Sequence, residues 1–428
     1  MLTEPQKSTK QAVSPLRSSQ FVTMFIVLCV LFSLGQFHRS AGAVLSPVFV
    51  EEFVLSAAQV GLVIGGMFIV QGLLQVPSGV LLDRYGTRRV LPTMALAAVV
   101  GCFLIGLAES WFLVLIGRAL LGVGFATSML GSYSVFVRWT TPELIGTVTG
   151  RFLFFGGTGA LLATFPLAWL IEVFDWRSVF LVLGGITLVA TIFTFVVVRD
   201  SPDDDVPDVA APQKTLIGSV LGLWVVLKDR RIWPALMIAP FLYSPLQVLI
   251  GLWAGPFFKD VHQIGAIDRS YILLMMVLGS NFGMLFYGPI ERFFNTRRNV
   301  ILAATGLISA GFLSVALFGY SSVWLSATLF LVITVVAPFF VVVLVHSQVM
   351  FPPEYANRVV SLVNLFSISG VFLNQYLTGS LIDAVTDDPT VTGSVAGYRL
   401  VFAYMAAVYL AITLVYSRTR DIPPRSAK

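Results

Sequence analysis

Long apolar runs separated by short polar loops constrain this chain more than any other feature. A helix needs about 20 mainly apolar residues to cross the hydrocarbon core of a bilayer. Of the 428 residues, 57% are hydrophobic and only 11% are charged. The sequence therefore predicts an all-α polytopic membrane protein with twelve transmembrane helices. The twelve runs cover residues 21–50, 57–82, 90–108, 111–137, 144–174, 178–198, 232–258, 270–290, 299–320, 322–350, 359–385 and 400–417.

The longest polar stretch, residues 199–231, divides the runs into two sets of six. Its start is rich in aspartate and proline, which predicts a flexible linker, and residues 214–230 have the pattern of an amphipathic helix at the membrane surface. We expect five parts in this order: an N-terminal tail (1–20), a six-helix bundle (21–198), the linker (199–231), a second six-helix bundle (232–417) and a C-terminal tail (418–428).

Four short patterns recur in the same order in both sets of runs, which predicts two pseudo-symmetric halves with a solute path between them. Pro142-Glu143 recurs as Pro353-Glu354, Gly159 as Gly370, and residues 87–89 as residues 296–298, and residues 176–180 are echoed by residues 398–402.

The basic residues predict the orientation. Twenty of the 27 lysines and arginines lie on the side that holds both termini and the linker, four lie on the opposite side, and three lie within runs. By the positive-inside rule, both termini should face the cytoplasm. We expect a bacterial inner (plasma) membrane, with a specialised intracellular membrane left open. Because the basic clusters lie between apolar runs, no nucleic-acid partner is expected.

The sequence carries no pattern typical of an enzyme. We find no G-x-S-x-G, no H-E-x-x-H, no P-loop and no paired carboxylates within the runs. Cys29 and Cys102 both lie in apolar runs, so no disulfide framework is expected. We predict a protein that is not an enzyme, has no cofactor and no metal site, acts as a monomer, and has the lipid bilayer and a small solute as its partners.

The loop between the second and third runs carries a recognisable motif. Residues 79–89 read GVLLDRYGTRR, and a degenerate copy lies at residues 288–298. This loop resembles the signature loop of the major facilitator superfamily, and the twelve runs agree with that resemblance. The resemblance implies a secondary transporter that works by alternating access. It also implies a set of gating residues: Gly79, Asp83, Arg84, Gly86, Arg88, Arg89 and Arg138.

Each gating residue has a physical reason. Gly79 should let two helices approach closely, and Gly86 should permit a tight turn. In the family, the aspartate of this loop engages an arginine that ends span four and the start of span eleven. Arg138 matches that arginine here, so Asp83 is expected to hold one conformation closed. The arginines of the loop should also anchor the topology.

Three arginines lie within the apolar runs, namely Arg39, Arg118 and Arg151, and none has a deep acidic partner. All 22 aspartates and glutamates lie in loops or near the ends of runs, the nearest being Glu172 and Asp383. Ionisable residues inside a membrane are costly and are candidates for function. A net positive interior favours an anionic solute, because a bound negative group offsets the cost of the desolvated guanidinium.

Residues 35–42, GQFHRSAG, are similar to span one of the organophosphate:phosphate antiporter branch of the superfamily. The resemblance implies that Arg39 binds an anion directly. That branch places a second arginine in span seven, whereas the corresponding stretch here offers Tyr243, Gln247 and Trp253. A phosphate clamp of two arginines is therefore not expected, and a carboxylate or a larger anion fits at least as well.

Other candidates each have two interpretations. Arg118 resembles the family's span-four arginine, which is structural or tied to proton movement. His38 could carry a proton or serve as a neutral hydrogen-bonding group, so a coupling proton stays open. Asn374 and Gln375 could line the path or join helices. Arg151 is expected to reach the membrane interface.

The leading hypothesis is a secondary active transporter of a small, anionic solute. A second hypothesis within transport is an anionic metal chelate or siderophore. A third belongs to another class, a transporter-like membrane sensor that binds its ligand and signals through a partner. Binding without crossing of the membrane would favour the sensor.

Overall fold

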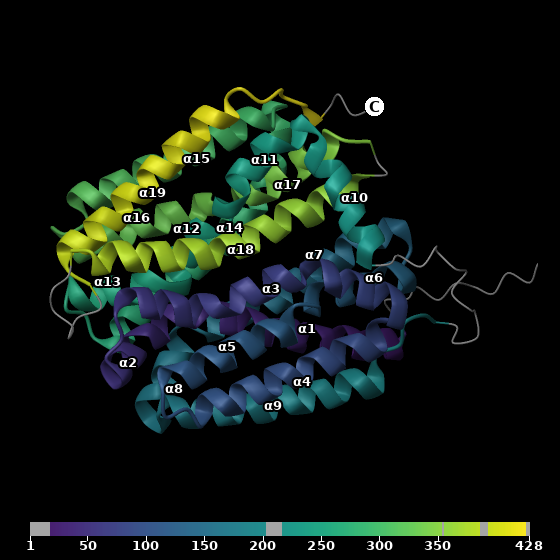
Figure 1. Ribbon diagram of the computed structural model, residues 1–428, viewed down its shortest axis with the longest axis horizontal. Coiled ribbons are helices and arrows are strands. Elements are labelled where there is room, and N and C mark those ends of the chain that lie inside the picture. Colours follow the sequence, from purple (N-terminus) through teal and green to yellow (C-terminus); the bar gives the residue numbers. More distant parts are fainter. Residues whose placement is uncertain (1–17, 203–215, 353–354, 386–392, 425–428) are drawn as a thin grey trace, which may run out of the picture.

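The computed structural model confirms the twelve predicted spans. It describes residues 18–202, 216–352, 355–385 and 393–424. Within these residues it contains twelve helical segments long and apolar enough to cross a membrane, and each coincides with one predicted run. The helices run side by side along the long axis of the molecule (Figure 1).

In the first half, three spans are continuous helices and three are broken near the middle. The continuous helices are α3 (Ala57–Tyr85), α4 (Thr87–Gly106) and α9 (Trp176–Val197). The broken spans are α1 (Ser19–Ser40) with α2 (Gly42–Phe53), α5 (Trp111–Phe125) with α6 (Ser128–Trp139), and α7 (Pro142–Leu162) with α8 (Phe165–Phe174).

In the second half, four spans are continuous and two are broken. The continuous helices are α14 (Ala266–Phe294), α15 (Arg298–Phe318), α18 (Ala356–Asp383) and α19 (Val395–Tyr416). The tenth span consists of α16 (Val323–Val336), η5 (Ala337–Phe339) and α17 (Phe340–Val349). The seventh span is divided into η2 (Arg230–Ile232), α11 (Trp233–Ile238), η3 (Ala239–Phe241), α12 (Ser244–Val248), η4 (Leu249–Trp253) and α13 (Ala254–Asp260).

Prolines account for the divided seventh span. Pro240 and Pro245 lie inside it, and proline removes a backbone donor and clashes with the preceding turn of a helix. The segment Leu249–Trp253 is a π-helix, a distortion that is frequent at functional sites. The seventh span therefore has irregular backbone through its middle.

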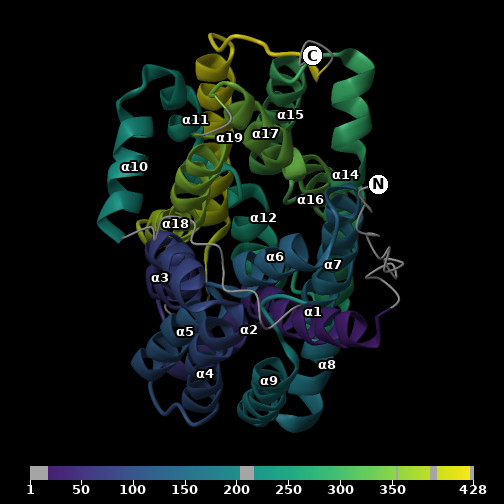
Figure 2. The ribbon, with the colours of Figure 1, turned by 90° about the vertical axis from the view of Figure 1, so that its right-hand side faces the viewer.

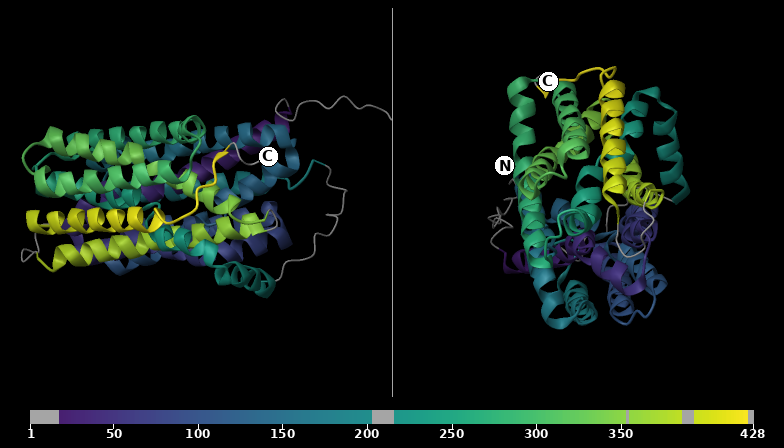
Figure 3. Two further views of the ribbon diagram at one scale, coloured as in Figure 1. Left: turned by 90° about the horizontal axis from the view of Figure 1, so that it is seen from above. Right: turned by 90° about the vertical axis from the view of Figure 1, so that its left-hand side faces the viewer.

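The two halves form separate groups of helices when the molecule is viewed from one end (Figure 2). We call this end, where α1 begins and α19 ends, the terminal end, and the opposite end the distal end. Helix α10 (Leu216–Lys228) follows the linker at the terminal end and packs against α3 of the first half and α18 of the second. It lies within the predicted interfacial segment 214–230, and Figure 3 shows it beside the bundle.

The contacts between the halves gather toward the distal end. Helices α3 and α18 run side by side, and Phe165 of α8 stacks on Tyr271 of α14 with ring centroids 4.7 Å apart. Glu51 and Lys259 form an ion pair between the first and seventh spans. The distal ends of the two halves are therefore packed together in this structure.

The internal repeat has a structural counterpart at the terminal end. Asp200, just after the first half, accepts hydrogen bonds from the backbone N–H groups of Thr87 (2.6 Å) and Arg88 (3.2 Å). Asp421, just after the second half, accepts them from Arg297 (3.1 Å) and Arg298 (3.0 Å). In each half a carboxylate thus caps the start of the third spanning helix, which is α4 in the first half and α15 in the second. The N–H groups at the start of a helix have no partner within the helix.

We expect Asp421→Asn to lower stability. Burial opposes the charged form of Asp421, but hydrogen bonds from Thr296, Arg298 and Arg297 hold the pKa of the carboxyl below its ordinary value of 3.8. Its contribution is therefore present above that ordinary value and is lost as the pH falls through the lowered pKa. Asparagine keeps an acceptor oxygen but loses the negative charge that the start of α15 favours, which costs about 0.3–1 kcal/mol and which a fall in apparent melting temperature at neutral pH would report. The exposed Glu109 provides the control, because Glu109→Gln should leave that temperature unchanged.

Candidate functional site

The break between α1 and α2 places Arg39 in the last turn of α1, where it is half-buried. Its Nε donates to Oε1 of Gln71 on α3 (3.2 Å), and its Nη1 donates to Oε1 of Gln36 one turn earlier (2.9 Å). Within the described residues, Nη2 has no hydrogen-bond partner and no carboxylate pairs with the guanidinium. Two neutral amides therefore orient Arg39 and leave its charge uncompensated.

Tyr243 approaches Arg39 from the second half. It lies between η3 and α12 of the divided seventh span, half-buried. Its hydroxyl donates to Oδ1 of Asn364 (3.1 Å), and its ring meets that of Phe340 edge-on at 4.7 Å between centroids. The hydroxyl lies within electrostatic reach of the Arg39 guanidinium. The structure thus brings these two predicted site residues together across the two halves.

Gln247 and Gln375 lie where the seventh and eleventh spans meet. Nε2 of Gln375 donates to the backbone carbonyl of Gln247 (2.8 Å). The Oε1 atoms of both side chains are buried and have no hydrogen-bond partner within the described residues. A buried acceptor without a partner is costly and marks a place where a ligand or a second conformation supplies a donor.

His38 and Arg118 face the interior of the first half instead. Arg118 is fully buried and donates to the backbone carbonyls of His38 and Ile64, each at 2.8 Å. The His38 ring packs against Phe125 and Phe180, at 5.6 and 5.9 Å between centroids. Arg118 therefore ties α5 to α1 and α3, which is the structural interpretation of this arginine. We leave both residues out of the proposed site.

Among the residues that the structure describes, the hydrogen-bond partners of Asn374 lie in the second half. Its Nδ2 donates to the carbonyls of Gly370 (2.8 Å) and Pro240 (3.0 Å), and its Oδ1 accepts from the hydroxyl of Tyr404 (3.2 Å). The side chain joins α18 to η3 and α19. This arrangement favours the helix-joining interpretation, so Asn374 is also left out of the proposed site.

The sequence analysis assigned no role to Gln36 and Gln71, the two amides that hold Arg39. A signal for each was present. Gln36 precedes Arg39 by three residues, so both lie on one face of a helix. Gln71 is a polar residue inside an otherwise apolar run, and it is almost fully buried. What the sequence did not provide is the arrangement of α3 beside the end of α1 that brings Gln71 to the guanidinium.

The motif loop between α3 and α4 forms a tight turn. Gly86 has a φ of +76°, which favours glycine, and a Cβ there would lie 2.4 Å from Oδ2 of Asp200. The backbone N–H of Arg88 is one of the donors to Asp200, and the Arg84 guanidinium lies over the Tyr85 ring at 5.2 Å. The turn expected at Gly86 is therefore present.

The remaining gating residues lie at the terminal end. Asp83 is exposed near the end of α3, Arg138 is half-buried near the end of α6, and Arg89 is exposed in the first turn of α4. No heavy atom comes within 4 Å of the Cβ position at Gly79. The close helix approach expected at Gly79 is thus not made in this structure, in which the halves are in contact toward the other end.

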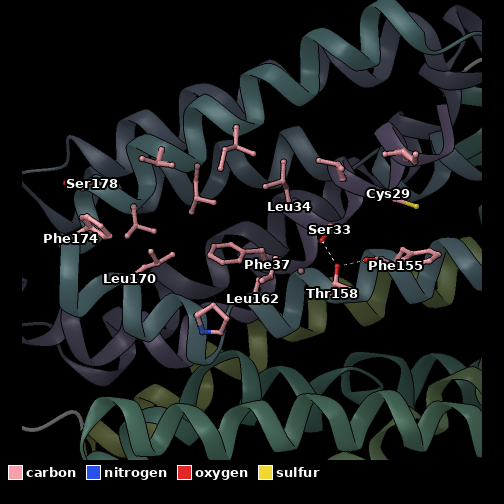
Figure 4. A pocket seen from close by; sticks show the side chains of 18 of the residues that line it. Cys29, Ser33, Leu34, Phe37, Phe155, Thr158, Leu162, Leu170, Phe174 and Ser178 are labelled. Atoms are coloured by element: carbon pink, nitrogen blue, oxygen red, sulfur yellow. Dashed lines mark hydrogen bonds between the residues drawn. The ribbon is translucent and has the colours of Figure 1, made fainter. Parts of the chain in front are cut away.

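A second candidate is a lateral pocket of about 780 Å³ between α1, α7, α8 and α9. Its wall is mainly aliphatic and aromatic, with Ser33 and Thr158 joined by a hydrogen bond of 3.3 Å at its base (Figure 4). The residues that line it include no charged side chain. Several of its apolar side chains are exposed, among them Ile26, Phe155 and Val182. A wall of this chemistry suits lipid chains and offers nothing to fix an ion.

The chain is similar to several known transporter proteins. The chain is 20% identical over 290 residues to the galacturonate transporter of Dickeya chrysanthemi, which covers 65% of this chain and 84% of that protein. It is 26% identical over 177 residues to a probable sulfoacetate transporter of Cupriavidus necator, a match that spans only 41% of either chain. A solved bacterial homolog of the human lysosomal transporter Spinster, inward-facing and unoccupied, superposes with a TM-score of 0.73 at 17% identity, covering 95% of this chain and 99% of that one.

The family follows from the sequence model that matches the chain. The model describes the Major Facilitator Superfamily, and it matches residues 21–374. That range includes all of the first half and most of the second. The motif at residues 79–89 and the twelve spans are accounted for by the same assignment. This chain is an integral membrane protein that belongs to the Major Facilitator Superfamily of transporters.

Proposed function

We propose that this protein is a secondary active transporter that carries a small organic anion by alternating access, with Arg39 as its anion-binding side chain. The observation that carries the proposal is the state of Arg39. It lies at a helix break, half-buried, held by Gln36 and Gln71, with Nη2 open and no acidic partner within the described residues. A guanidinium with unused donors suits a carboxylate or a similar oxyanion.

The charge balance supports an anion over a neutral or cationic solute. Removing a charged group from water costs several kcal/mol unless it is paired. Since all 22 carboxylates in the chain lie in loops or near span ends, the chain supplies no deep counter-ion for Arg39. A bound anion fills that role and gives the site its selectivity.

Tyr243 provides a neutral second arm from the other half. Its hydroxyl is hydrogen-bonded to Asn364, so it can turn toward an anion held by Arg39 when the halves approach. One positive charge with a neutral donor opposite favours a carboxylate or sulfonate over a doubly charged phosphate group. The names of the two relatives above, a galacturonate and a probable sulfoacetate transporter, are consistent with this class.

The basic residues orient the transporter. Twenty of the 27 lie on the terminal side, which supports an orientation with that side in the cytoplasm, across a bacterial inner membrane. Because the distal ends of the halves are packed together, this structure then corresponds to an inward-facing conformation. Arg39 would receive or release its anion on the cytoplasmic side in this state.

The test is uptake into proteoliposomes. Labelled hexuronates, short sulfonates, inorganic phosphate and a neutral sugar are presented separately, with and without a pH gradient. We expect saturable uptake of at least one carboxylate or sulfonate and none of the neutral sugar. Uptake of the neutral sugar alone would contradict the anion assignment, and binding without uptake would contradict transport.

A further inference from the structure

The N-terminus of α3 is capped partly by the opposite half of the protein. Within α3's own segment, Ser56 Oγ accepts from the backbone N–H of Gln59 (3.3 Å), and Gln59 Oε1 accepts from that of Ser56 (2.9 Å). This capping box leaves the N–H groups of Ala57 and Ala58 without a partner in their helix. Asp383 accepts both, Oδ1 from Ala57 (2.7 Å) and Oδ2 from Ala58 (2.9 Å).

Asp383 is the last residue of α18, so these bonds join the two halves at the distal end. The helices meet backbone to backbone there. A Cβ at Gly379 would lie 2.3 Å from the carbonyl oxygen of Ala57, and a Cβ at Gly61 would lie 2.3 Å from that of Gln375. Glycine thus lets the carboxylate reach the first turn of α3, where the partial positive charge of the helix end also favours an anion.

We infer that Asp383 is a gating residue that holds the distal end closed in this conformation. The inference rests on the alternating access of the proposed function, because the two halves must separate at the distal end once in every cycle. Separation exposes the carboxylate and the two N–H groups to water, which replaces the lost hydrogen bonds, so the latch is reversible. Its removal shifts the balance between the two conformations toward the one open at the distal end.

Other carboxylates show why this one acts on conformation rather than on folding alone. Asp200 binds two N–H groups at the start of α4 in the same way, but both partners belong to the first half. That contact moves as one body when the halves separate, whereas the contact of Asp383 must break. Asp83 lies near the other end of α3, and the family resemblance leads us to expect that it engages the start of α18. The pair would then carry one latch at each end.

The test measures the distance between the halves at the distal end, without any solute. Spin labels are attached at Glu109→Cys and Ser321→Cys, which are exposed in distal loops of the first and second halves. The native Cys29 and Cys102 are buried. In liposomes, Asp383→Asn is expected to raise the population of molecules with the long label distance, relative to those with the short one, by about tenfold or more. The reason is that two hydrogen bonds to a charged group are weakened.

Three further variants make the result decisive. Ala57→Pro removes one N–H donor from the other side of the latch. Proline is tolerated at the first position of a helix. Ser56 already has the extended backbone that proline requires of the residue before it. It should shift the distances in the same direction. Asp383→Glu keeps the charge and should restore most of the short distance. The matched control Asp200→Asn should leave the distances unchanged.

Unchanged distances in both Asp383→Asn and Ala57→Pro would overturn the latch, as would an equal shift in Asp200→Asn. Because no anion is present, failure of the anion assignment would not alter these distances. Conversely, Arg39-dependent uptake with unchanged distances would remove the latch and leave the proposed function intact.

Discussion

Arg39→Ala is expected to weaken the binding of organic anions at least about thirtyfold while the protein still inserts and folds. Removing the guanidinium leaves the anion in a low-dielectric site whose nearest polar groups are the neutral amides of Gln36 and Gln71. Loss of one partner of a buried charge pair costs about 2–5 kcal/mol. Equilibrium binding of a labelled anion to purified protein, with gel filtration as the check on folding, measures the effect.

Two variants separate charge from geometry. Arg39→Lys keeps the positive charge but loses the planar fork that contacts both amides and a carboxylate, so we expect binding about tenfold weaker than in the wild type. Arg151→Ala removes another arginine of the first half, exposed at the middle of α7, and should change the affinity less than threefold. If Arg39→Ala bound every anion as the wild type does, the anion site would lie elsewhere.

The fold could be predicted from the sequence because the bilayer sets both the length and the composition of a span. Every predicted run became a membrane-spanning segment. The helix breaks were harder to place. Pro240 and Pro245 mark the divided seventh span, but the break after Ser40 contains no proline, and α2 beyond it packs against η4 and α13 of the other half.

The site could be predicted only in part. Arg39 and His38 are adjacent in an apolar run, and the sequence indicates only that they point about 100° apart. Which of them faces the path depends on the rotation of α1, which is fixed mainly by packing against α7 and α9. An apolar run that is buried on several sides has no strong periodicity to reveal that rotation. Gln71 joins the site for the same reason, through a contact of α3 with α1.

Close packing at the distal end gives the second large expected effect, in Gly42→Ala. A Cβ at Gly42 would lie 1.9 Å from the carbonyl oxygen of Gly251 in the opposite half. The reciprocal contact is as tight, since a Cβ at Gly255 would lie 1.8 Å from the carbonyl oxygen of Ala43. One added methyl group must therefore push the first and seventh spans apart, and overpacking of this kind costs about 1–3 kcal/mol.

That cost falls on one conformation only. The state closed at the distal end contains the clash, and the state open there does not, so Gly42→Ala should lower the rate of uptake at least about fivefold while the protein stays folded. Gly255→Ala should do the same from the other half.

In Gly159→Ala a Cβ would lie 1.8 Å from the carbonyl oxygen of Ser33, but both residues belong to the first half. The same crowding is present in both conformations, so Gly159→Ala should reduce the apparent melting temperature of the protein. Uptake rates and melting curves of the three variants distinguish the two effects, and normal uptake by Gly42→Ala would show that the transport cycle does not require the first and seventh spans to close at this point.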